Sequence, residues 1–141
     1  MKLKVKIETL AVEYYDIETG CMPIRITAGE KEYTDCFSCY WDPLPDLKQW
    51  LESIVQDVEQ CSFTYDNEGQ VITFDYKCLW LDRKKVCQFS VFWKDNNNSL
   101  LFKTLAETRQ LVEAFYCSLI NLYDSDEYNP REWEFKANNF I

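Results

Sequence analysis

Residues 61–93, which read CSFTYDNEGQVITFDYKCLWLDRKKVCQFSVFW, decide the fold. Apolar residues alternate with polar ones over 61–65, 72–80 and 87–93, and a period of two is typical of half-buried strands. The first two segments are joined by DNEG at 66–69, with glycine where a turn needs a positive φ. The sequence therefore predicts consecutive antiparallel strands. The last of them carries apolar residues on both faces, which favours a central place in the sheet.

Three further strands are predicted before this region. The alternation of apolar and charged residues over 3–14 indicates a first strand, and its phase slips near Thr9, where we expect a β-bulge. Ile24 and Ile26 mark a second, short strand. The segment 33–40 is interpreted as the third.

Two amphipathic helices complete the prediction. The first is expected to be capped by Asp42 or Asp46 and to end near Gln60. Its apolar face repeats with a helical period, over Leu47, Trp50, Leu51, Ile54 and Val58. The second is expected to open at Thr104 with the capping-box sequence TLAE and to end near Tyr123. The order β-β-β-α-β-β-β-α predicts an α+β fold, with a mostly antiparallel sheet of about five to seven strands.

Length and composition favour one domain over 1–141. At 141 residues, with 47% apolar residues, the chain can bury a core without a disulfide or a metal. It opens with MKLKVKIETL, which is no signal peptide, and it has no apolar run long enough to cross a membrane. We therefore expect a cytoplasmic protein whose seven cysteines are reduced thiols that pack as small apolar residues.

The charge of the chain limits its partners. The formal net charge is −9, of which −5 lies in 44–80 and −4 in 104–141. A small basic stretch at 83–85 separates the two acidic segments. Nucleic acid and anionic membranes are polyanions that this charge would repel, so the sequence predicts neither as a partner. A basic protein is the partner that the charge favours.

The residue types present in the chain exclude several classes of chemistry. The chain has no histidine, which removes the commonest general base and a common metal ligand. Its three glycines leave no phosphate-binding loop. Cys36 and Cys39 form a C-x-x-C whose alternatives are a redox pair, half of a zinc site, or core packing, and we favour packing. We predict no catalytic residue, no metal and no cofactor.

Partner binding is the function that the sequence favours. The predicted contact residues are acidic or aromatic and lie in the tail 124–141 and the turn 66–69: Asp124, Asp126, Glu127, Tyr128, Glu132, Trp133, Glu134, Asp66 and Glu68. The tail either meets a partner or packs on the domain. The leading hypothesis is a non-catalytic immunity or inhibitor protein that binds a toxin or nuclease. Alternatives are a nucleic-acid mimic, a small carboxylate- or thiol-dependent enzyme, and a homodimer formed through a sheet edge.

Overall fold

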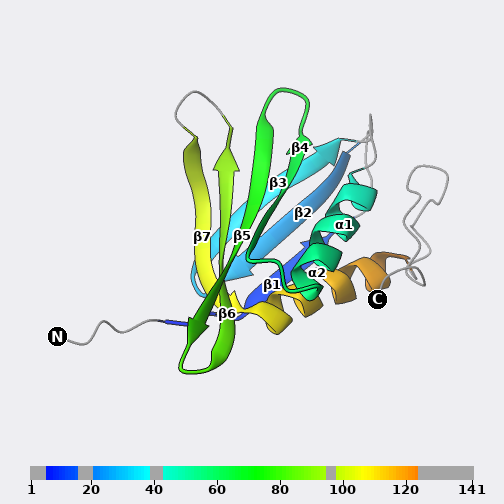
Figure 1. Cartoon of the computed structure of the whole chain (residues 1–141). Coiled ribbons are helices and arrows are strands. Elements are labelled where there is room, and N and C mark those ends of the chain that lie inside the picture. Colours follow the sequence, from blue (N-terminus) through cyan, green and yellow to red (C-terminus); the bar gives the residue numbers. More distant parts are fainter. Residues whose placement is uncertain (1–5, 16–20, 39–42, 95–97, 124–141) are drawn as a thin grey trace.

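The residues that the structure describes form seven strands in two antiparallel sheets, with two helices beside them (Figure 1). This computed structural model describes residues 6–15, 21–38, 43–94 and 98–123. The first sheet has the order β1 (Leu10–Tyr14), β2 (Cys21–Ala28), β3 (Lys31–Ser38). The second has the order β4 (Gln60–Asp66), β5 (Val71–Leu81), β6 (Lys84–Trp93), β7 (Ser99–Glu107). The helices are α1 (Leu44–Val55) and α2 (Thr108–Tyr123).

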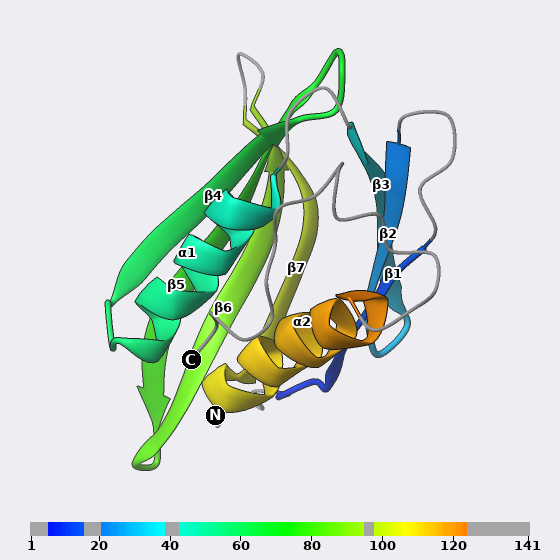
Figure 2. The ribbon, with the colours of Figure 1, turned by 90° about the vertical axis from the view of Figure 1, so that its right-hand side faces the viewer.

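The core lies between the two sheets, and the helices close one side of it (Figure 2). α1 packs beside β4, α2 packs against β1, and the two helices contact each other. On the opposite side β3 meets β7. Trp50 of α1 sits at the centre, with its ring 5.4 to 6.4 Å from the rings of Phe63, Phe74, Phe89 and Phe115. Aromatic contacts of this kind join both helices to the larger sheet.

The α+β class, the antiparallel pairing and the two helices are confirmed, with the strands divided between two sheets. β5 and β6 pair from Ile72↔Trp93 to Leu81↔Lys84, as their alternation predicted. β6 lies between β5 and β7 and is buried on both faces, so the prediction of a central strand is confirmed. The turn at 66–69 is also confirmed, with positive φ at Glu68 and Gly69.

The predicted start of the second helix is wrong. Thr104 does not begin a helix but lies inside β7, where its side chain is buried and donates a hydrogen bond to Glu8 Oε1 (2.7 Å). α2 begins at Thr108. Phe102, Thr104 and Ala106 all face the core, so β7 has the period of two that is typical of a strand. The pattern is hard to recognise in the sequence because one of these core residues is polar and another is small. The region between the helices therefore holds four strands, where the sequence predicted three.

Two other boundaries differ from the prediction. Of the predicted first strand, residues 10–14 form β1, whereas residues 6–9 belong to no strand, so there is no bulge at Thr9. α1 follows Pro43 without a side-chain cap; Asp46 lies in its first turn, and Asp42 is outside the described residues. The helix ends at Val55 and not near Gln60, and Asp57 has a positive φ just beyond its end.

Candidate protein-binding surface

Two of the predicted contact residues fall within the described part of the chain. Asp66 Oδ1 accepts hydrogen bonds from the backbone N–H of Glu68 (2.8 Å) and Gly69 (3.1 Å), so this carboxylate fixes the β4–β5 turn. Glu68 is exposed and has no ion-pair partner among the described residues. The other predicted contacts lie outside the described residues: Asp124, Asp126, Glu127, Tyr128, Glu132, Trp133 and Glu134.

Most of the described acidic side chains that form no ion pair with a described residue lie in 44–80. The described residues include fifteen acidic side chains, and seven of them pair with a lysine or arginine. Most of these pairs are exposed and add little stability, but they do neutralise charge locally. Eight acidic residues have no such partner in this part of the chain, and five of the eight belong to α1, β4, β5 and their connections: Asp46, Glu59, Asp66, Glu68 and Asp75.

A groove of about 460 Å³ runs between α1 and β4 at the centre of this acidic region. α1 contributes residues spaced three and four apart, which share one helix face, and β4 contributes consecutive residues. The lining consists of Asp46, Gln49, Trp50, Ser53, Cys61, Ser62, Phe63 and Thr64. The indole Nε1 of Trp50 donates a hydrogen bond to the carbonyl oxygen of Cys61 (3.2 Å), which ties the helix to the strand. The groove is therefore built into the fold, with an apolar floor and a polar rim.

One acidic residue lines the groove, and two others lie next to β4. Asp46 stands on the α1 rim, and Glu59 directly precedes β4. Asp75 of β5 is held beside β4 by a hydrogen bond from Ser62 Oγ (2.8 Å). β4 itself contains no lysine or arginine, and the single basic residue of α1, Lys48, is paired with Glu52 (3.2 Å). Lys77 of β5 lies opposite Gln60. Carboxylates therefore outnumber basic side chains in α1, β4, β5 and their connections.

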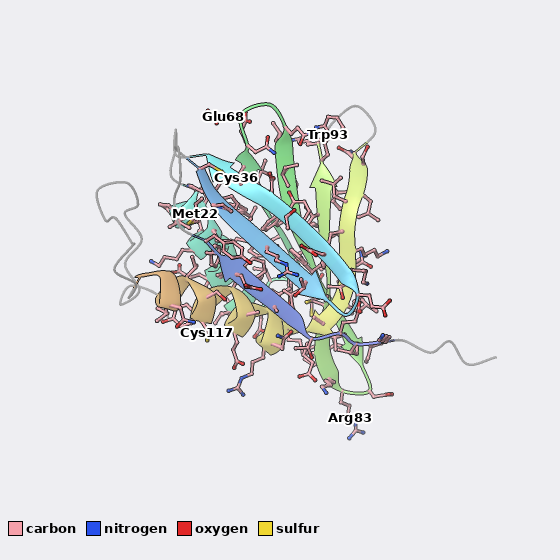
Figure 3. All side chains as sticks on the ribbon, turned by 180° about the vertical axis from the view of Figure 1, so that it is seen from behind. Met22, Cys36, Glu68, Arg83, Trp93 and Cys117 are labelled. Atoms are coloured by element: carbon pink, nitrogen blue, oxygen red, sulfur yellow. A yellow bond between two sulfur atoms is a disulfide. The ribbon has the colours of Figure 1, made fainter. Side chains whose placement is uncertain are left out.

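The basic stretch predicted from the sequence lies at the far end of the molecule. Figure 3 shows Arg83 at one end and Glu68 at the other. Lys84 pairs with Glu107 (2.6 Å), and Lys85 pairs with Asp57. Two of the three charges are thus compensated, as expected for a solvated hairpin turn.

A polar cluster that was not predicted from the sequence joins the two sheets. Asp35 accepts hydrogen bonds from the hydroxyls of Tyr33 (2.8 Å) and Tyr65 (2.5 Å) and from Asn67 Nδ2 (3.0 Å). The two hydroxyls also contact each other (2.8 Å). Burial holds the pKa of both tyrosines well above its usual value, so they stay protonated as donors. The alternation over Tyr33, Asp35 and Phe37 was the available signal, because it places the carboxylate on the core face.

One cysteine pair corrects the expectation of seven free thiols. Cys21 and Cys36 form a disulfide across β2 and β3, with a Cα separation of 5.7 Å that lies within the usual range. Both belong to the outward face of the smaller sheet, because the alternate residues Met22 and Phe37 are buried. Cys36 therefore does not pack in the core, and Cys39 lies outside the described residues.

The described free thiols are poor nucleophiles where they are buried. Burial raises the pKa of Cys87 to about 12 and that of Cys61 to about 11, so both are protonated at neutral pH. Within the described ranges, no three cysteine or acidic side chains come together in a way that could hold a metal ion.

Known proteins do not identify this chain. No protein family, no curated protein and no solved structure matches it. Among the described residues, no helix is both long and apolar enough to span a membrane. What the chain binds therefore has to be inferred from its own residues.

Proposed function

We propose that this protein is a non-catalytic binding module whose acidic surface around the α1–β4 groove holds a basic protein partner. The observation that carries the proposal is that five carboxylates without an ion-pair partner among the described residues lie in 44–80, the segment that also forms the groove, and that one of them, Asp46, lines it. A toxin or nuclease fits this role, because an enzyme that binds phosphate has a positive active site. An immunity or inhibitor protein can occupy such a site by fast, salt-sensitive association.

The absence of an evident catalytic group in the described surface supports a binding role. Asp35, the carboxylate with the most hydrogen bonds, has its oxygens occupied by Tyr33, Tyr65 and Asn67. Cys61 lines the groove, but burial keeps its thiol protonated.

We also propose a cytoplasmic location, although the disulfide between Cys21 and Cys36 is more typical of an oxidising compartment.

Charge reversal of the groove tests this function. The variant combines Asp46→Lys, Glu59→Lys and Glu68→Lys, which are groups without an ion-pair partner among the described residues. The control reverses Glu13, Glu32 and Glu113 to lysine; these are exposed carboxylates away from the groove, so the net charge changes equally. Each protein is immobilised and exposed to extract from the source cell at low and high salt, and the captured proteins are identified by mass spectrometry.

The expected result is a basic protein that the unaltered module and the control retain at low salt and release at high salt. The groove variant should not retain it. Equal retention by the groove variant and the control would contradict the proposal. Recovery of a DNA- or RNA-binding protein that nucleic acid displaces would instead favour the nucleic-acid mimic.

A further inference from the structure

β4 is an edge strand whose outward backbone groups have no partner among the described residues. The carbonyl of Glu59 accepts a hydrogen bond from Cys78 N (2.7 Å) across the β4–β5 ladder. Residues of an antiparallel pair alternate between facing the partner strand and facing away from it. Ser62 and Thr64 therefore direct their N–H and C=O groups away from β5. Both residues line the groove, so these groups point to where a ligand would lie.

The β1 edge of the smaller sheet, in contrast, is closed by side chains of α2. Gln110 Oε1 accepts a hydrogen bond from Leu10 N (2.8 Å), and Gln110 Nε2 donates one to Leu10 O (2.6 Å). Ser118 Oγ donates a further hydrogen bond to Val12 O. An exposed edge is a template for pairing with another chain, and this one is satisfied internally.

The other edge of the larger sheet is also partly closed. The backbone N–H of Glu8 donates to Leu105 O (2.7 Å), and Lys31 Nζ donates to Lys103 O (2.8 Å). β4 has neither a covering segment of this kind nor the lysine or proline that commonly protects an edge. The β4 edge, which faces the groove, is thus open in the described structure, whereas the β1 edge is closed and the β7 edge is partly closed.

We propose that β4 binds an extended, lysine- or arginine-rich segment of the partner by strand addition. This inference rests on the proposed function and deepens it. Main-chain hydrogen bonds to Ser62 and Thr64 would supply affinity, and alternate side chains of the added strand would supply specificity. Side chains on its α1 side meet Asp46, while basic residues near its ends meet Glu59 and Glu68. A second copy of this chain is disfavoured, because its β4 would bring the same negative charges against themselves.

A synthetic peptide tests strand addition without knowledge of the partner. The probe alternates lysine with valine and matches β4, whose length is 7 residues. One control peptide carries glutamate in place of lysine. A second carries N-methyl groups on alternate residues, which keeps the charge but removes the amide donors on one edge. Binding is measured by isothermal titration calorimetry against the full chain.

Substitutions at Thr64 separate the backbone from the side chain. Thr64→Pro removes an outward N–H, and proline is tolerated at such positions of an edge strand. Thr64→Val is the matched control, because it keeps the N–H and the strand propensity. We expect Thr64→Pro to raise the Kd of the lysine–valine peptide at least about tenfold, and Thr64→Val to leave it unchanged.

Only the unmethylated basic peptide should bind, and amide exchange at Ser62 and Thr64 should slow when it does. Equal binding of the N-methylated peptide would overturn strand addition, even if Thr64→Pro failed to fold. A dimer of the free protein that is detected by light scattering and pairs through β4 would also overturn strand addition. If the groove charge reversals abolish capture of the partner while N-methylation and Thr64→Pro change nothing, the proposed function stands and the edge pairing fails.

Discussion

Replacing Gln110 with alanine should destabilise the protein by about 2 kcal/mol. The side chain makes two hydrogen bonds to the backbone of Leu10, at 2.8 and 2.6 Å, and Leu10 is 2% exposed. Each bond contributes about 1 kcal/mol net, and the buried backbone groups cannot easily regain a water partner. Alanine has a slightly better helix propensity than glutamine, which offsets a few tenths of a kcal/mol. The loss corresponds to a lower Tm by about 4–8 °C.

The assay is urea unfolding followed by circular dichroism, with the free energy of unfolding extrapolated to water. Arg109→Ala is the matched control, because Arg109 is the neighbouring residue and makes only an exposed pair with Glu113 (2.9 Å). It should lose less than about 0.5 kcal/mol. A Gln110→Ala variant as stable as the control would refute the view that α2 side chains satisfy the β1 edge. The contrast with the open β4 edge would then lose its basis.

Three other sets of substitutions test contacts elsewhere in the fold. Tyr65→Phe removes the hydroxyl that donates to Asp35 (2.5 Å), so the free energy of unfolding should fall by about 2 kcal/mol, and a fall below about 0.5 kcal/mol would contradict the buried cluster. The Lys31 ammonium and the Thr104 hydroxyl hold the pKa of Glu8 below its usual value, so ionised Glu8 stabilises the fold at neutral pH, and this stabilisation is lost as the pH falls through the lowered pKa. Glu8→Gln should therefore be less stable than the parent at pH 7 and converge with it in acid, and a difference that does not change with pH would refute this. Replacing Cys21 and Cys36 with alanine should cost about 3 kcal/mol for a sequence separation of 15, whereas equal urea midpoints would argue against the disulfide.

Strong periodicity made part of the fold predictable. β5 alternates between apolar and polar residues over 71–77, β6 is apolar on both faces as a central strand should be, and the turn at 66–69 has a glycine with a positive φ. The buried face of α1 was also correct over Leu47, Trp50, Leu51 and Ile54, whereas Val58, which was predicted with them, lies beyond the end of the helix. In each case the local sequence and the tertiary packing favour the same structure.

The remainder depended on contacts that the local sequence does not contain. Thr104 looks like a helix cap, but its hydroxyl is satisfied by Glu8, nearly a hundred positions away. Cys21 and Cys36 are diagonal neighbours in the β2–β3 register, opposite Ser38 and Pro23, and cysteine spacing alone does not predict their disulfide. Of the candidate site, the acidic stretch 44–80 was recognised from charge. The groove beside β4 and its open edge needed the arrangement of α1 against the sheet.

Amide hydrogen exchange on the complex with the captured partner tests the central claim most directly. We expect the N–H groups of Ser62 and Thr64, which face away from β5, to exchange faster in the free protein than those of Phe63 and Tyr65. Binding should slow exchange at Ser62 and Thr64 strongly. Unchanged exchange at these two amides in a fully formed complex would contradict the claim that β4 is the binding edge.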